Sequence, residues 1–254
     1  MLSSNKIKFI KSLNQKKNRE YNNCFIVEGE KIILELINSN FNIIEILSTK
    51  DFIDNHKINN NITQITEYEL QKISNLKTPN KAVAIVKIPN KSFNNNIFNN
   101  LNIILDNIQD PGNLGTIIRT ADWFGINNIF CSTNTVDVFN HKVIQSTMGA
   151  IFRVNIFYTD ILKLIQDAID NKQKIYGALL SGKNIYNTKL ENSGLIILGN
   201  ESKGISKPIQ DLISDKIKIP NYPENNNNME SLNVSIANAI ILAEFRRQQH
   251  HIDI

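Results

Sequence analysis

The stretch NIILDNIQDPGNLGTIIRTADWFGINNIFCS, residues 102–132, gives the first indication of architecture in this chain of 254 residues. It begins with an apolar run that is typical of a buried strand, and a turn then leads into a helix expected over residues 113–125. A second apolar run, residues 128–132, closes the stretch. Neither run alternates cleanly between apolar and polar residues, so both are expected to be strands of a parallel sheet that is covered on both faces.

The same alternation of strand and helix continues toward the C-terminus. Further strands are expected at residues 152–158, 174–180, 194–200 and 216–220, with helices between them. A long helix over about residues 231–248 completes the series. The expected fold class is therefore α/β, with a parallel sheet in the C-terminal domain.

A smaller α/β unit precedes this domain. Short strands and helices alternate from FIVEG at residues 25–29 to AVAIVKI at residues 82–88. Residues 89–100, PNKSFNNNIFNN, combine Pro, Asn and Ser with weak periodicity, which is the composition of a linker. Two domains are expected, an N-terminal one over residues 1–95 and a C-terminal one over residues 101–254.

Composition places the chain among globular proteins. Hydrophobic residues make up 41% of the chain, which is enough for packed cores and excludes a disordered tail. No apolar run approaches the roughly 18 residues of a membrane-spanning helix, so no membrane partner is expected. Cys24 and Cys131 lie too far apart for a metal site and are too few for a disulfide framework, which favours a reducing cytoplasm.

The formal net charge of +4 conceals a local excess of cations near the N-terminus. Residues 1–20 contain a single acid, Glu20, and the following basic residues: Lys6, Lys8, Lys11, Lys16, Lys17 and Arg19. Such a cluster is either the solvated face of a helix or a patch that contacts the phosphates of a nucleic acid. Charge alone leaves both interpretations open.

Three turns follow strands directly in the C-terminal domain, within residues 106–121, 198–206 and 219–240. In an open parallel sheet, ligands bind beyond the C-terminal ends of the strands, so all three turns are expected to line one pocket. DPGNLGT, residues 110–116, has neither the GxGxxG spacing nor the GxxxxGK[ST] pattern. This argues against nicotinamide cofactors, nucleoside triphosphates and a methyltransferase of the ordinary Rossmann type.

In their order, these segments resemble the motifs of one family. NLGTIIRTADWFG, then LGNESKGIS, then IP followed by SLNVSIANAIILAEFRRQ resemble the three motifs of the SpoU (TrmH-like) family of RNA ribose 2′-O-methyltransferases in the SPOUT superfamily. The resemblance covers roughly residues 101–248. Upstream, FIVEGEKIILE and AVAIVKIP look like the RNA substrate-binding domain that many members of the family carry.

The resemblance implies a homodimer whose catalytic domain contains a deep trefoil knot, a feature that periodicity cannot suggest. It also implies that the knot builds a site for S-adenosylmethionine, with Gly199, Ile219 and Leu232 around the cofactor. The loop at residues 221–230 is longer than in many relatives and includes a run of Asn. No cofactor contact is carried over to that loop.

Four positions match the family's catalytic motifs: Arg119, Asn113, Glu201 and Asn233. Methyl transfer to a hydroxyl requires stabilisation of the developing alkoxide, and we favour this electrostatic role for Arg119 because a guanidinium is rarely a base. Asn113 is expected both to cap its helix and to shape the substrate site. Glu201 is expected to accept a hydrogen bond from Arg119 or from the RNA sugar, or to cap the following turn. Trp123 is expected in the core.

Together these features predict a cytoplasmic, dimeric enzyme that uses S-adenosylmethionine to methylate a ribose 2′-hydroxyl of RNA. A 23S-type ribosomal RNA is the preferred substrate, because family members that act on transfer RNA often lack the extra N-terminal domain. In this context the six basic residues from Lys6 to Arg19 are expected to bind RNA. Two alternatives stay open: the same chemistry on transfer RNA, and a non-catalytic RNA-binding or ribosome-assembly factor with the same fold.

Overall fold

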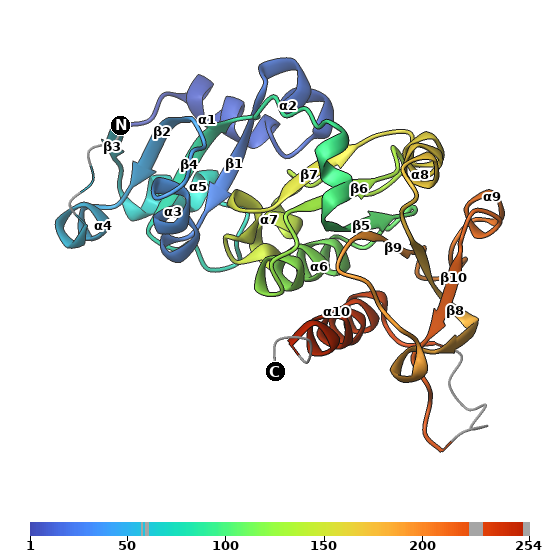
Figure 1. Ribbon diagram of the computed structural model, residues 1–254. Helices are drawn as coiled ribbons and strands as arrows, with labels where there is room; N and C mark the ends of the chain where they lie inside the picture. The colour runs from blue at the N-terminus through green and yellow to red at the C-terminus, as the bar shows by residue number, and fades with distance from the viewer. Residues whose placement is uncertain (57, 59–60, 224–230, 251–254) are drawn as a thin grey trace. The chain divides into compact units, whose positions relative to one another are not determined.

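The computed structural model describes residues 1–56, 58, 61–223 and 231–250 (Figure 1). Its contacts divide the chain into two compact units. The first unit consists of Met1–Asn90 and Asp137–Arg153, and the second of Lys91–Val136 and Val154–Ile254. A single boundary near residue 95 does not describe this division, because residues 137–153 pack with the N-terminal part of the chain.

In the first unit, the described residues form a mixed sheet with the strand order β1-β4-β2-β3. The strands are β1 (Cys24–Glu28), β2 (Ile43–Ser48), β3 (Ile62–Gln64) and β4 (Ala82–Lys87). β4 pairs antiparallel with both β1 and β2, whereas β2 and β3 run parallel. Every residue of β1 is buried, and so are all but the last residue of β4, which shows that both faces of these strands are covered.

The helices of the first unit are α1 (Ser4–Ser12), α2 (Lys16–Asn22), α3 (Glu30–Ile37), α4 (Lys50–Asn55), α5 (Glu67–Ile73) and α7 (His141–Thr147), with the 3-10 turn η2 (Ala150–Phe152). α1 and α5 pack on one apolar cluster, in which Ile10, Leu13 and Leu70 meet residues of the sheet. The sequence does not predict α2, α4 or β3. These elements are short and contain at most two apolar residues each, which is too few for a clear hydrophobic period.

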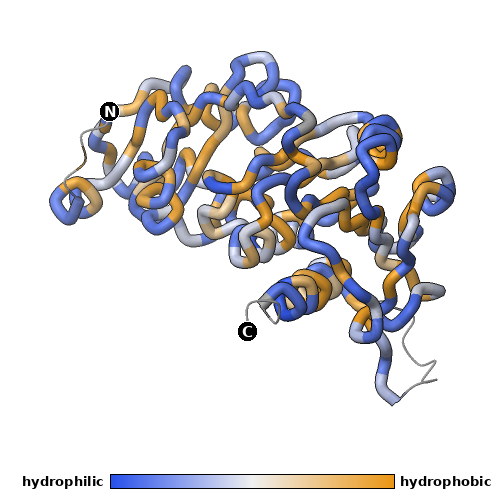
Figure 2. Tube along the Cα trace, in the orientation of Figure 1, coloured by the Kyte–Doolittle hydropathy of each residue, from blue (hydrophilic) through white to orange (hydrophobic). Residues whose placement is uncertain are grey.

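In the second unit, the described residues form a sheet with the order β10-β8-β9-β5-β6-β7, and every neighbouring pair is parallel. The strands are β5 (Leu101–Leu105), β6 (Asn128–Cys131), β7 (Asn155–Tyr158), β8 (Ile175–Asn184), β9 (Gly194–Leu198) and β10 (Asp215–Lys218). All residues of β5 and β9 are buried, and Figure 2 shows how hydrophobic residues concentrate along the strands. The predicted parallel α/β sheet is confirmed.

The helices of the second unit are α6 (Pro111–Trp123), α8 (Ile161–Asp170), α9 (Lys207–Gln210) and α10 (Val234–His250), with the 3-10 turns η1 (Asn95–Asn99) and η3 (Ile185–Asn187). No helix in the described part of the chain is long and apolar enough to cross a membrane. α6 and α10 pack against each other.

α6 begins two residues earlier than the sequence predicts. Asp110 is its N-cap, because the Asp110 side chain accepts a hydrogen bond of 2.8 Å from the Asn113 N–H, and Pro111 occupies the first helical position. The expectation that Asn113 caps this helix is therefore wrong. Asn113 lies inside the first turn, which leaves its side chain available for contacts outside the helix.

Candidate active site

Three turns leave the same edge of the parallel sheet. One follows β5 and leads into α6, one follows β9 at residues 199–206, and one follows β10 at Ile219. β5 and β9 are neighbours in the sheet, and β8 alone separates β9 from β10. Because the C-terminal ends of parallel strands meet at one edge, segments that are far apart in the sequence converge here.

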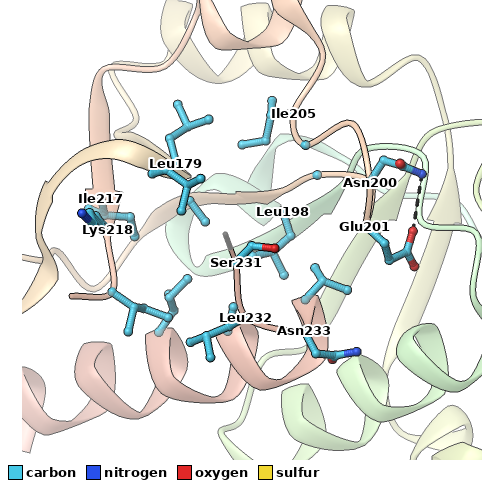
Figure 3. Close-up of a pocket in the computed structure, with 18 of the residues that line it drawn as sticks. Leu179, Leu198, Asn200, Glu201, Ile205, Ile217, Lys218, Ser231, Leu232 and Asn233 are labelled. Atoms are coloured by element: carbon cyan, nitrogen blue, oxygen red, sulfur yellow. Dashed lines mark hydrogen bonds between the residues drawn. The ribbon is translucent and has the colours of Figure 1, made fainter. Parts of the chain in front are cut away.

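A cavity of about 610 Å³ opens at this edge, between the turns after β9 and β10 and the start of α10 (Figure 3). Its walls are mainly apolar and include Leu179, Leu198 and Ile217. The residues expected around the cofactor all line it: Gly199, Ile219 and Leu232. Residues 224–230 of the long loop that follows Ile219 lie outside the described residues.

Two of the four catalytic candidates, Glu201 and Asn233, also line the cavity. Figure 3 shows Glu201 beside Asn200 on one side of the cavity and Lys218 on the opposite side. Two opposite sides of the cavity thus carry polar or charged side chains, and between them apolar side chains surround Ser231. Such a lining fits a ligand that combines a flat apolar ring system with charged groups.

The turn after β9 folds tightly back on itself. Asn200 and Gly204 exchange two backbone hydrogen bonds, with N–O distances of 3.0 and 2.9 Å. Asn200 Oδ1 also accepts hydrogen bonds of 3.0 Å from the N–H groups of Ser202 and Lys203. A Cβ atom on Gly199 would lie 2.2 Å from the backbone carbon of Gly204. Only glycine fits at position 199, and its backbone therefore forms the cavity wall directly.

Glu201 joins this turn to the start of α6. Its carboxylate accepts hydrogen bonds of 3.0 Å from Asn113 Nδ2, 3.2 Å from the Asp110 N–H and 3.3 Å from the Gln109 N–H. Burial raises the pKa of Glu201, but the hydrogen bonds outweigh burial and hold the pKa below its ordinary value. The carboxylate is charged at neutral pH. Among the described residues its partners do not include Arg119, which was one of the expected donors.

Asn113 in turn connects Glu201 to the start of α10. Asn233 Nδ2 donates a hydrogen bond of 2.9 Å to Asn113 Oδ1. Asn233 Oδ1 accepts from the N–H of Ser235 at 2.9 Å and from its hydroxyl at 2.7 Å, so Asn233 caps α10. A chain of hydrogen bonds therefore runs from Glu201 through Asn113 to Asn233 and ties together the three sequence motifs. Each amide is held from both sides, which fixes its orientation.

Arg119 lies outside this chain of hydrogen bonds. Its side chain is exposed on α6, and no described residue forms a hydrogen bond or an ion pair with it. Six residues separate it from Asn113, which corresponds to a rotation of roughly 240° about the helix axis. The two side chains thus leave α6 on different faces. Arg119 presents an unshared guanidinium, a group suited to bind a phosphate or a developing oxyanion.

Four of the six basic residues near the N-terminus are exposed: Lys8, Lys11, Lys16 and Lys17. Lys6 is partly buried and forms an ion pair of 2.5 Å with Glu45. The exposed lysines lie on α1 and α2 of the first unit. Their ammonium groups are placed where a phosphate backbone can reach them.

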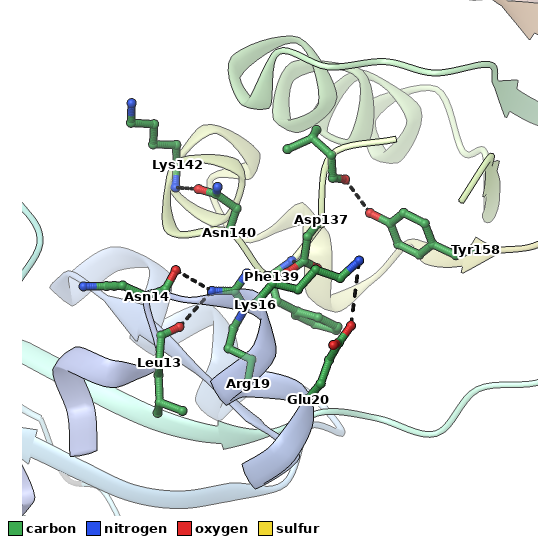
Figure 4. A network of polar contacts seen from close by, with 11 residues as sticks. Leu13, Asn14, Lys16, Arg19, Glu20, Asp137, Phe139, Asn140, Lys142 and Tyr158 are labelled. Carbon is green, nitrogen blue, oxygen red and sulfur yellow. Dashed lines mark hydrogen bonds and ion pairs between the residues drawn. The ribbon is translucent and has the colours of Figure 1, made fainter. Parts of the chain in front are cut away.

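Arg19 departs from the expectation that it binds RNA. Its side chain is only 4% exposed and forms an ion pair with Asp137, and its Nη1 donates to the carbonyls of Leu13 and Asn14 at 2.8 and 2.9 Å (Figure 4). A guanidinium held in this way has no free donor pair to offer a phosphate. Arg19 instead ties α2 to residues 137–153 within the first unit.

The sequence interpretation missed several residues that build the site. Asn200, Gln109 and Asp110 shape the turns around Glu201, as described above. Asp106 Oδ2 accepts a hydrogen bond of 2.7 Å from the Ser206 N–H and so joins the turn after β5 to the turn after β9. One feature of the sequence could have identified these four residues. Each lies in a turn that follows a buried strand within a motif, and the backbone amides of such turns need hydrogen-bond acceptors.

Comparison with known proteins places this geometry in a family. The SpoU rRNA methylase family matches residues 100–243, and the MRM3-like substrate-binding domain matches residues 4–84. The 23S rRNA (guanosine(2553)-2′-O)-methyltransferase RlmP of Bacillus subtilis is 28% identical over 244 residues, which cover 95% of this chain and 96% of that protein.

Solved structures show the same architecture over the whole chain. A TrmH-family protein from Porphyromonas gingivalis is 34% identical with a TM-score of 0.88, covering 98% of this chain and 99% of that one. An AdoMet-bound rRNA methyltransferase from Sinorhizobium meliloti is 24% identical with a TM-score of 0.83, covering 97% and 96%, and shares the fold. The first likeness is close, and the family match spans more than half of the chain. The chain therefore belongs to the SpoU rRNA methylase family.

Proposed function

We propose that the protein transfers a methyl group from S-adenosylmethionine to a ribose 2′-hydroxyl of a 23S-type ribosomal RNA in the cytoplasm. One observation carries the proposal: Gly199 of the second motif and Ile219 and Leu232 of the third line a single cavity, beside a hydrogen-bonded chain that adds Asn113 of the first motif. The choice of ribosomal RNA is supported by the likeness to RlmP, which extends over both units.

The cavity fits S-adenosylmethionine. Its volume of about 610 Å³ lies within the range of small-molecule sites. The apolar wall of Leu179, Leu198 and Ile217 suits the adenine ring, while the polar end near Glu201 suits the charged amino-acid part. The absence of a side chain at Gly199 lets the turn after β9 close against Gly204 at the cavity wall.

The cofactor supplies an activated methyl group, and the chain must hold the ribose hydroxyl in line with it. The pKa of that hydroxyl is far above neutral pH, so the enzyme must also stabilise the alkoxide that develops as the proton leaves. Arg119 is the group for this task, because its guanidinium is charged and unshared. Asn113 and Asn233 keep α6 and α10 in register at the cavity, and Glu201 anchors the turn after β9 to α6.

A homodimer is part of the proposal. Trp123, which was expected in the core, is 85% exposed, and Ile236 on the adjoining helix α10 is 53% exposed. Arg119 and Trp123, four residues apart, share one face of α6. An exposed indole is suited to a contact with another protein surface. A second copy that covers this face brings its own chain next to Arg119. The deep trefoil knot of the family, formed around the cofactor site, belongs to the same proposal.

The experiment is incorporation of labelled methyl from S-adenosylmethionine into unmodified ribosomal RNA, ribosomal particles and transfer RNA, followed by mapping of ribose methylation. The expected result is one 2′-O-methylated nucleotide in the large-subunit RNA, absent with Arg119→Ala. Methylation of transfer RNA alone would assign the same chemistry to that substrate. No incorporation into any RNA, together with no calorimetric binding of S-adenosylmethionine, would leave a non-catalytic RNA-binding factor.

A further inference from the structure

The C-terminal end of α6 carries backbone carbonyls that have no partner within the helix. α6 ends at Trp123, Phe124 is its C-cap, and the chain then turns through Gly125 with a positive φ of 66°. The last carbonyls of any helix lack intrahelical donors and carry the negative end of the helix dipole. At this end a cation from another element is favourable.

Arg246 of α10 supplies that cation. Its Nε donates a hydrogen bond of 2.7 Å to the Phe124 carbonyl, and its Nη2 donates one of 3.2 Å to the Gly125 carbonyl. Its Nη1 donates to Gln249 Oε1 at 2.5 Å, within α10. Burial lowers the pKa of Arg246, yet a guanidinium remains charged at neutral pH. All three nitrogens of the guanidinium are thus engaged, two of them with α6.

α10 therefore holds α6 at both ends. At the start, its cap Asn233 bonds to Asn113 in the first turn of α6. About 20 Å further along α10, Arg246 bonds to the carbonyls of Phe124 and Gly125, which directly follow the last residue of α6. The two helices run parallel, since their starts meet and their ends meet. α10 also lines the cavity, through Val234, Ala237 and Ile241. It is the element that connects the cavity to α6.

We propose that Arg246 is a positioning residue for methyl transfer, which fixes the end of α6 to α10 and so sets the position of Arg119 relative to the cavity. The proposal rests on the proposed methyltransferase function. Without Arg246, a tilt of α6 by 10° about the Asn113–Asn233 contact would displace a side chain six residues away by roughly 1.5 Å, and displacements of this size are costly in catalysis. Arg246 does not line the cavity.

Three variants test the proposal in the full-length protein. Arg246→Gln removes the cation, Arg246→Lys keeps a cation near the α6 carbonyls, and Arg247→Gln makes the same change of charge at a neighbouring side chain that pairs with Glu244 instead. For each we would measure kcat, the KM for RNA, calorimetric binding of S-adenosylmethionine, the thermal midpoint, and hydrogen exchange of the amides at the end of α6.

Arg246→Gln is expected to lower kcat roughly tenfold, while the affinity for S-adenosylmethionine and the KM for RNA stay within about twofold. Arg246→Lys should recover a large part of kcat. Arg247→Gln should keep the wild-type kcat although its thermal midpoint falls, because Glu244, which is only 4% exposed, loses its ion-pair partner. Amides in the last turn of α6 should exchange faster in Arg246→Gln alone. A purely stabilising role would instead lower the thermal midpoint without separating kcat from cofactor binding.

An unchanged kcat in Arg246→Gln, or equal losses of kcat and cofactor affinity, would overturn the proposal. If the wild-type protein methylates none of the RNAs, the proposed function fails, and hydrogen exchange then decides the inference by itself. Unaltered exchange at the end of α6 in Arg246→Gln would show that Arg246 does not hold this helix.

Discussion

Arg119 on α6 and Arg19 on α2 place the same guanidinium in opposite surroundings. Arg119 is exposed and has no partner among the described residues, whereas Arg19 is 4% exposed and bonds to Asp137 and to two backbone carbonyls. A buried guanidinium is tolerated only when its donors are satisfied, and an unshared one at a surface is available to a ligand. The first residue is suited to chemistry, and the second holds its unit together.

The comparison separates two kinds of sequence signal for a cation. Arg119 was identified from its place in an ordered motif, whereas Arg19 was identified from a local excess of charge. Charge clustering does not distinguish the side that faces solvent from the side that faces the fold. On α2, Lys16 and Lys17 face solvent, whereas Arg19, three residues after Lys16 and two after Lys17, turns inward. The following predictions test this distinction.

The largest effect is expected for Arg119→Ala. Loss of the guanidinium removes stabilisation of the developing alkoxide, so methyl transfer should fall by at least about a hundredfold. Binding of S-adenosylmethionine should stay within about twofold, because Arg119 does not line the cavity. Single-turnover methylation and calorimetry measure the two quantities. If the methylation rate and the affinity for S-adenosylmethionine fell together, Arg119 would contribute to cofactor binding, and the prediction would be wrong.

Arg19→Ala should act on stability instead. It leaves Asp137 and two carbonyls without their partner in a buried setting, which should lower the unfolding free energy by roughly 3 kcal/mol. Urea denaturation measures the change, with Lys17→Ala as the exposed control, expected within about 0.5 kcal/mol of wild type. Comparable stability of the two variants would remove the contrast between inward and outward cations.

The exposed lysines should govern the affinity for RNA. A variant with glutamine at four positions is informative: Lys8, Lys11, Lys16 and Lys17. If each lysine neutralises one phosphate, the slope of log K against log salt should become shallower by about 3. Filter binding between low and moderate salt measures the slope.

The matched control carries the same substitutions at exposed lysines of the second unit: Lys163, Lys183, Lys189 and Lys207. Its salt dependence should stay at the wild-type value. If both variants shift the slope equally, the positive charge acts through the whole molecule, and the α1–α2 surface has no special part in binding RNA.

The smallest effect concerns the attachment of α1 to α5. The Glu69 carboxylate accepts hydrogen bonds from the Thr66 N–H at 2.9 Å and the Leu2 N–H at 2.5 Å, which lower its pKa from 4.5 to about 2. A lowered carboxyl pKa stabilises the fold above the unfolded value of 4.5, and this contribution disappears as the pH falls toward 2.

Glu69→Gln should therefore be less stable than wild type at neutral pH, and the difference should vanish in acid. Thermal midpoints across the pH range measure it. A difference that stays constant with pH would mean that the Glu69 charge contributes nothing to the attachment of α1, and that packing on the apolar cluster alone holds this helix.

The sequence predicted the strands of the second unit and most helices, and it missed a few short elements that contain few apolar residues. The parallel strands β5 and β9 were found because each is a continuous apolar run beside a helix of clear period. α2 and α4 were missed because one or two turns contain too few residues to reveal a period. The beginning of α6 was misplaced because Asp110 and Asn113 are both good caps, and Pro111 settles the choice in the structure.

The candidate site, too, was predicted only in part from the sequence. The motif positions Gly199, Ile219 and Leu232 were named from sequence, and they line one cavity. The hydrogen bonds that connect Glu201, Asn113 and Asn233 were not predictable, because they join residues that are far apart in the chain. Spacing along a sequence carries no information about which turn of a sheet edge lies beside another.

Local sequence determined the α/β class, the parallel sheet and the residue types at the turns, because hydrophobic period and turn chemistry act over a few residues. The tertiary structure alone decided three things. It grouped residues 137–153 with the first unit, it buried Arg19 against Asp137, and it left Arg119 exposed. Each depends on contacts between distant segments, which form only when the folded chain brings their surfaces together.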